Sequence, residues 1–102
     1  MARHLDHPDP RDVPLARLLS ALGDPARLRI MAVLADRAEH PRGDFEVGVG
    51  PSTLSHHMKT LREAGLTWHR LEGTRCFVSL REEAFRCFPD VLESVLAANE
   101  TS

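Results

Sequence analysis

Cysteine, tyrosine and long apolar runs are scarce or missing in this sequence. Its 102 residues include two cysteines, one tryptophan and no tyrosine. Two cysteines far apart in the chain do not form the disulfide framework that staples small secreted domains. No apolar run approaches the roughly 18–20 residues of a membrane-spanning helix, and residues 1–12 lack the apolar core of a signal peptide. We therefore expect a cytoplasmic protein.

Motifs that carry catalysis are also missing. The sequence has no G-x-S-x-G motif and no glycine-rich loop that could cradle a phosphate. It has no pair of carboxylates with an obvious catalytic role, because Glu82 and Glu83 fit the first turn of a helix, where acidic residues complement the helix dipole. We therefore expect no enzyme.

The length and the distribution of charge favour one small domain that contacts nucleic acid. A chain of 102 residues has room for a single modest core, and we predict a flexible arm over residues 1–12 and one domain over residues 13–99. The net charge is −2, but the segment from Ser52 to Arg81 holds five cations and two anions, a local charge of +3. The local field decides contact with DNA, and the total charge does not.

Residues 50–66 predict one helix with two different faces. Pro51 suits a first helical position, and Gly65 stands where a helix often ends in a left-handed residue. The apolar positions follow the spacing of one buried face: Leu54, Met58 and Leu61. The other faces carry short polar side chains and one cation: Ser52, Thr53, Ser55, His56, Lys59 and Thr60. Such a face suits phosphate oxygens and base edges, although an ordinary amphipathic surface helix is the alternative.

A basic hairpin is predicted immediately after this helix. Residues 67–72 and 75–80 are strand-like, and Gly73 lies between them at the turn. Arg70 and Arg75 flank that turn. A helix able to enter a groove, followed at once by a basic hairpin, is the plan of a winged helix-turn-helix. The fold class that we predict is therefore mainly α with a small β-hairpin.

Three blocks of the sequence together resemble the ArsR/SmtB family of bacterial winged helix-turn-helix transcriptional regulators. The blocks are LGDPARLRI at 22–30, STLSHHMKTLREAGL at 52–66 and EGTR at 72–75. They resemble, in order, the entry to the family's second helix, its recognition helix and its wing tip. The resemblance implies a sequence-specific DNA-binding regulator, most simply a dimeric repressor that binds an inverted-repeat operator in double-stranded DNA.

The candidate DNA contacts come from the recognition helix and the wing. We predict that the following residues contact DNA: Ser52, Thr53, Ser55, His56, His57, Lys59, Thr60, Arg62, Arg70, Thr74 and Arg75.

Apolar stripes at the two ends of the domain predict a homodimer through its first and last helices, as the resemblance also implies. The stripes are Leu15, Leu18, Leu19 and Leu22 on the first helix, and Val91, Leu92, Val95 and Leu96 on the last. The alternative is that both stripes only complete the core of one chain. The second helix begins at Asp24-Pro25, and we expect its Arg27 and Arg29 to form surface ion pairs.

Residues 36–50 depart from the family pattern. Pro41, Gly43 and Gly48 are poor helix formers where a supporting helix is expected. We predict a short helical turn or loop around 44–47, anchored in the core by Phe45 and Val47. The resemblance implies two possible metal sites, a cysteine cluster in this region and a site with Asp and His on the last helix. This region has no cysteine and the last helix has no histidine, so neither set of metal ligands is present. We predict no metal site and no other cofactor.

The two cysteines leave one alternative function open. Cys76 and Cys87 fit small, partly buried apolar positions, but a thiol-based redox switch that pairs them is a second hypothesis. It would require a thiolate near a cation and Cα atoms within about 7 Å. A third hypothesis is a winged-helix adaptor that binds another protein, which would not need the Ser/Thr/His/Lys face.

Overall fold

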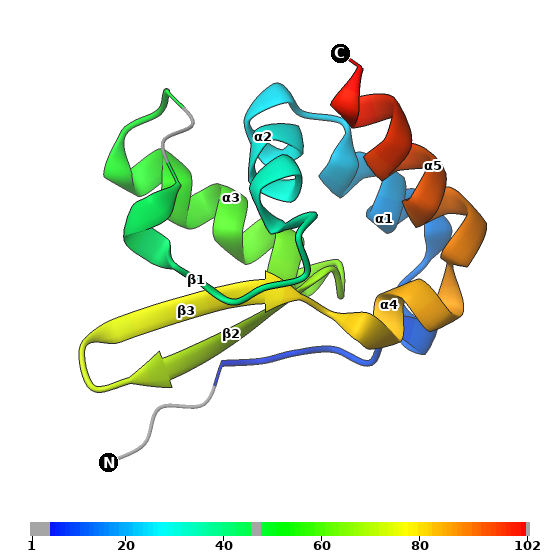
Figure 1. The fold of residues 1–102 in the computed structure, drawn as a ribbon. Coiled ribbons are helices and arrows are strands. Elements are labelled where there is room, and N and C mark those ends of the chain that lie inside the picture. Colours follow the sequence, from blue (N-terminus) through cyan, green and yellow to red (C-terminus); the bar gives the residue numbers. More distant parts are fainter. Residues whose placement is uncertain (1–4, 46–47, 102) are drawn as a thin grey trace.

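Most of the helical part of the chain lies on one side of a small antiparallel sheet (Figure 1). The computed structural model describes residues 5–45 and 48–101. The helices are α1 (Leu15–Leu22), α2 (Pro25–Leu34), α3 (Pro51–Glu63), α4 (Glu82–Cys87) and α5 (Pro89–Glu100). The strands are β1 (His40–Pro41), β2 (Thr67–Glu72) and β3 (Arg75–Leu80), and two short 3₁₀ turns are η1 (Pro10–Asp12) and η2 (Arg42–Asp44). The predicted fold class, mainly α with a β-hairpin, is confirmed.

The hairpin has the boundaries that the sequence predicts. β2 and β3 pair antiparallel from Thr67 opposite Leu80 to Glu72 opposite Arg75. Gly73 takes a φ of 59° in the turn, a left-handed conformation that suits glycine. A third strand, β1, pairs with the other edge of β3, with His40 opposite Val78. This strand is only two residues long and is not predicted from the sequence.

The core corrects part of the predicted dimer interface. Leu18, Leu22 and Leu92 are 1%, 5% and 0% exposed and belong to the buried cluster of their own chain. Leu15 and Leu19, by contrast, are each 48% exposed. Val91, Val95 and Leu96 are half-buried against the core. Helical spacing identifies an apolar stripe, but it does not say which edge of the stripe packs inward, so the prediction merged core and surface positions.

The segment before the recognition helix is a strand and a turn. The helical turn is η2, two or three residues earlier than the predicted turn around 44–47. Phe45 is 5% exposed and packs in the core as predicted, whereas Val47 lies outside the described residues. His40 Nε2 lies 2.9 Å from Asp36 Oδ1, and this hydrogen bond raises the pKa of His40. Pro41 and Gly43 disfavour the helix that the family pattern would place here.

Residues 5–12 pack along the outer edge of the sheet (Figure 1). The His7 ring stacks on Trp68 at 3.9 Å between centroids, and its Nε2 accepts a hydrogen bond of 3.0 Å from the backbone N–H of His69 on β2. The guanidinium of Arg81 donates to the carbonyl of Pro8. His7 and Pro8 of the predicted arm thus pack against the domain. The division into residues 1–12 and 13–99 stays a prediction.

Acidification should release this segment from the sheet edge. Burial lowers the pKa of His7 from 6.5, and the charges of Arg81 and Arg62 act in the same direction, while a hydrogen bond with the Leu5 backbone and the charge of Asp6 oppose them. A lowered folded pKa means that the packing is fully present above pH 6.5 and is lost as the pH falls through the folded pKa. Since Trp68 is the single tryptophan, its fluorescence should report the release.

The matched control for this titration is H7Q. The glutamine amide can still accept the N–H of His69 but does not titrate. The emission of this variant should therefore stay flat over the range in which the wild-type emission changes. An H7Q titration identical to that of the wild type would show that another group controls the tryptophan.

Among the described residues, no helix has the length and apolar character that crossing a membrane requires.

Candidate nucleic-acid interface

Local signals at both ends fix the boundaries of α3. Pro51 is its first residue, and Gly50 is the N-cap in an extended conformation. At the other end Gly65 has a φ of 75°, and the N–H of Leu66 bonds to the carbonyl of Leu61 at 3.1 Å. The N–H of Gly65 bonds in turn to the carbonyl of Arg62. This pair of bonds is a Schellman motif, so the helix ends where the sequence predicts.

One face of α3 is open to solvent at the same side of the molecule as the hairpin tip. Met58 and Leu61 are buried in the core, while Leu54 packs partly against it. Figure 1 shows the N-terminal end of α3 and the turn between β2 and β3 on the same side, away from α1 and α5. The exposed polar residues of the helix are Ser52, Thr53, Ser55, His56 and Lys59, and Glu63 at its last position. This arrangement can contact a groove and its flanking backbone together.

Arg42 is a candidate contact that is not among the residues predicted from the sequence. It lies on η2 and donates a hydrogen bond from Nη2 to Ser55 Oγ on α3. It also lines a cleft of about 540 Å³ between η2 and the hairpin, together with Thr74 and Arg75. A basic residue in the segment before the recognition helix was the available signal. The pairing of β1 with β3, which places that residue beside the helix, could not be anticipated from local patterns.

The two hairpin arginines differ in how far their charge is compensated. Arg70 pairs with Glu39 and Glu72, both at 2.9 Å, and these carboxylates raise its pKa. Arg75 is exposed, and its guanidinium carbon lies 4.9 Å from the centroid of the Phe77 ring. No ion pair of Arg75 occurs within the part of the chain that the structure describes. Arg75 therefore offers an uncompensated charge, and Arg70 largely does not.

His57 does not face the DNA side. Its side chain is buried, with 8% of the residue exposed, and its Nδ1 lies 2.9 Å from Nη1 of Arg27. The prediction of His57 as a DNA contact is therefore wrong, because its position on α3 turns it toward α2. The expected surface ion pair of Arg27 is also wrong: Arg27 Nε donates to the carbonyl of Ala21 at 2.6 Å, at the end of α1.

Arg62 also departs from the exposed face. It is half-buried, and its Nε is a buried atom with no hydrogen-bond partner among the described residues. It lies near His69, whose pKa is lowered to about 3, first by burial and next by the charge of Arg62. The Arg62 guanidinium thus belongs to the space between α3 and the sheet, and the structure does not bring it together with Ser55 and His56.

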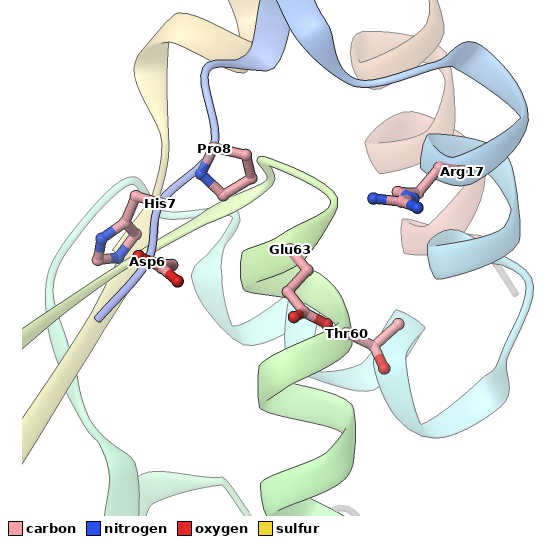
Figure 2. A pocket seen from close by; sticks show the side chains of 6 residues that line it. All are labelled: Asp6, His7, Pro8, Arg17, Thr60 and Glu63. Carbon is pink, nitrogen blue, oxygen red and sulfur yellow. The ribbon is translucent and has the colours of Figure 1, made fainter.

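Thr60 lies beside a polar pocket of about 630 Å³ near the C-terminal end of α3. In Figure 2, Arg17 approaches this pocket from α1, while Thr60 and Glu63 belong to α3. The N-terminal segment forms the remaining wall with Asp6, His7 and Pro8. Thr60 is half-buried, so it is less accessible than Ser55 and His56 one to one and a half turns earlier.

The cysteines and the histidines form no reactive constellation in the described residues. Cys76 and Cys87 are half-buried free thiols. Burial raises the pKa of Cys76, which lowers its thiolate fraction and disfavours the redox hypothesis. Within residues 5–45 and 48–101, no group of three or more His, Cys, Asp or Glu side chains is placed to hold a metal ion.

Known proteins of one functional class match most of the chain. Residues 22–67 match a family model described as a helix-turn-helix domain. The HTH-type transcriptional regulator YceK of Bacillus subtilis is 38% identical over 84 residues, which are 78% of this chain and 84% of that protein. The HTH-type transcriptional regulator CmtR of Mycobacterium tuberculosis is 34% identical over 92 residues, 87% of this chain and 77% of CmtR.

Solved structures agree with the sequence matches. A homodimeric winged helix-turn-helix DNA-binding domain from Mycobacterium bovis, described as a possible ArsR-family transcriptional regulator, superposes with a TM-score of 0.65 at 30% identity. The match covers 85% of this chain and 81% of that one. The transcriptional repressor BigR from Xylella fastidiosa superposes with a TM-score of 0.59 at 29% identity, over 76% of this chain and 84% of BigR.

Proposed function

Because the chain belongs to the ArsR/SmtB family of winged helix-turn-helix DNA-binding transcriptional regulators, we propose that it is a dimeric repressor that binds an inverted-repeat operator. The observation that carries this proposal is the exposed polar face of α3, with Ser55, His56 and Lys59, on a helix whose N-terminal end lies on the same side of the molecule as the hairpin tip (Figure 1). Donors and a cation on a helix that faces outward beside a basic hairpin fit a major groove and its flanking phosphates.

The contacts divide into two sets with different effects. Ser52, Thr53, Ser55, His56 and Lys59 are exposed on α3 and would read base edges or anchor the helix in the major groove. Arg42, Thr74 and Arg75, which line the cleft beside the hairpin, would contact phosphates. The first set gives sequence specificity, and the second strengthens binding to any duplex.

Repression by a dimer is supported by two relatives and by the surface of α1. BigR is a transcriptional repressor, and the Mycobacterium bovis domain is homodimeric. Leu15 and Leu19 are large apolar side chains left half exposed on α1. A two-fold dimer would separate two recognition helices by about 34 Å, one helical turn of DNA, and would require an inverted repeat. A regulator of this kind acts where the chromosome is, so we place it in the cytoplasm.

The test of this function is the double variant S55A/H56A. Against an operator selected in vitro from random duplexes, each lost base contact should cost roughly 1–3 kcal/mol, with little change in affinity for random DNA. R75A should instead weaken binding to all sequences and flatten the salt dependence. Fluorescence anisotropy at several salt concentrations measures both effects. A double variant that keeps its full specificity ratio would show that another element reads the bases.

A further inference from the structure

One polar side chain of α3 points into the protein instead of toward solvent. His57 follows the exposed His56 in the sequence, but the two residues lie on different sides of the helix, with 8% of His57 exposed. Arg27 on α2 reaches it, with Nη1 at 2.9 Å from His57 Nδ1. The two residues are thirty positions apart in the chain. This contact is therefore a tertiary link between the recognition helix and its support.

The hydrogen bond from Arg27 determines which nitrogen of the His57 ring carries the proton. A guanidinium has only N–H donors and no acceptor. His57 Nδ1 must therefore offer its lone pair to Arg27, which leaves the ring proton on Nε2. His57 Nε2 lies 3.9 Å from Asp24 Oδ2, too far for a direct hydrogen bond. The His57 ring is thus held by one directional bond from Arg27 and faces a carboxylate on its other side.

The same arginine also contacts the end of α1 and the start of its own helix, α2. Its Nε donates to the carbonyl of Ala21 at 2.6 Å, and its Nη2 donates to the carbonyl of Ser20 at 3.4 Å. Both carbonyls are at the C-terminal end of α1, where helices leave carbonyls without intrahelical partners. The backbone N–H of Arg27 donates to Asp24 Oδ2 at 3.0 Å, which caps the start of α2. The end of α1, the cap of α2 and the middle of α3 therefore meet at one arginine, through its guanidinium and its backbone N–H.

We propose that His57 and Arg27 are positioning residues that set the rotation of α3 about its axis, and thereby the register of Ser55 and His56 against the bases. The core anchors of α3, Met58 and Leu61, are apolar, and dispersion contacts are weakly directional. The hydrogen bond from Arg42 to Ser55 holds the outer face of α3, and on the face toward α2 the hydrogen bond from the charged Arg27 supplies the directional constraint. The inference rests on the proposed function, because it assigns these residues a role in reading the operator.

A small rotation is enough to matter. With side chains included, an α-helix has a radius of about 5–6 Å, so a rotation of about 10° moves a surface group by roughly 1 Å. Hydrogen bonds to base edges tolerate only a few tenths of an ångström. Loss of the Arg27–His57 bond should therefore reduce sequence discrimination, while non-specific binding to phosphates is retained because it depends on charge.

The experiment compares H57L, H57N, R27M and the double variant R27M/H57L with the wild type. Leucine fills the space without an acceptor, whereas the asparagine oxygen takes nearly the place of Nδ1 and can accept from Arg27. Methionine keeps the unbranched stem of Arg27 without its donors. For each protein, anisotropy gives the ratio of affinities for the selected operator and for a random duplex. Circular dichroism confirms folding, and sedimentation confirms that the dimer is kept.

H57L and R27M should each lower the specificity ratio about tenfold, H57N should stay within about twofold of the wild type, and R27M/H57L should be no worse than either single change. The rescue by asparagine and the non-additivity are results that a purely structural role would not give. An unchanged ratio in H57L, an H57N variant as poor as H57L, or losses that multiply in the double variant would overturn the inference.

Two further outcomes keep the test decisive. If H57L is unfolded at the assay temperature, the specificity ratios of R27M and R27M/H57N are compared instead. Equal losses of the ratio support the inference, because asparagine cannot act without the arginine. A larger loss in the double variant contradicts it. A wild-type protein without any operator preference would overturn the proposed function itself, which is a different result from a specific wild type whose H57L variant is equally specific.

Discussion

Replacing Leu15 and Leu19 together with glutamate should convert the homodimer into a folded monomer and lower operator affinity by roughly 100-fold or more. Both side chains are 48% exposed in the single chain, so the change should leave the core intact. Covering each leucine at an interface stabilises the dimer by roughly 1.5–3 kcal/mol before the costs of association are subtracted. Buried, unpaired carboxylates would oppose the same interface.

Two controls separate loss of the dimer from loss of the fold. A16E/S20E adds the same charge to exposed positions of α1, further around the helix from the leucines, and should remain dimeric. L92E places a carboxylate at a position that is 0% exposed and should unfold the chain, so it cannot test the interface. Sedimentation, circular dichroism and operator titration report the three properties. A wild-type monomer that binds a single half-site normally would contradict the dimer proposal.

The recognition helix and the hairpin could be predicted because their signals are local. Pro51 and Gly65 mark the ends of α3, and the strands around Gly73 have the boundaries that alternation and the turn residue indicate. Each of these signals depends on neighbours within a few positions in the chain. Such features form in the same way whatever the rest of the fold does.

Features that depend on distant contacts could not be predicted. The stripe containing Leu92 looked like an interface, because helical periodicity does not say whether the chain itself or a second copy covers a side chain. His57 is predicted as a DNA contact although it lies close to the apolar side of the helix, since nothing near it in the sequence indicates the contact with Arg27. Arg42 was overlooked because its place beside Ser55 follows from the pairing of β1 with β3. The sequence thus predicts the recognition helix and the hairpin of the candidate site. The contacts of His57 with Arg27 and of Arg42 with Ser55 could be found only in the folded structure.

The R42A variant should lose both affinity and specificity, a combined loss of roughly 100-fold on the operator. Arg42 lines the cleft beside the hairpin, so its removal takes away one cation that could neutralise a phosphate, and the salt slope should fall by about one. Arg42 also donates to Ser55 Oγ. With that lone pair occupied, the serine hydroxyl is oriented to donate its hydrogen toward a base acceptor, and alanine at position 42 removes this orientation.

R42K separates the two roles. Lysine keeps the charge but not the planar fork of arginine, so binding to random DNA and the salt slope should return to wild-type values, while the specificity ratio stays low. The matched control is R70Q/E72Q, which removes both ion pairs of Arg70 without changing the net charge. It should alter affinity by less than about twofold, because the charge of Arg70 is already compensated by Glu39 and Glu72. If R42K were fully specific, Ser55 would need no orientation by Arg42. If R42A kept the wild-type salt slope, Arg42 would lie away from the phosphates, and the DNA would have to approach α3 from the side opposite the cleft.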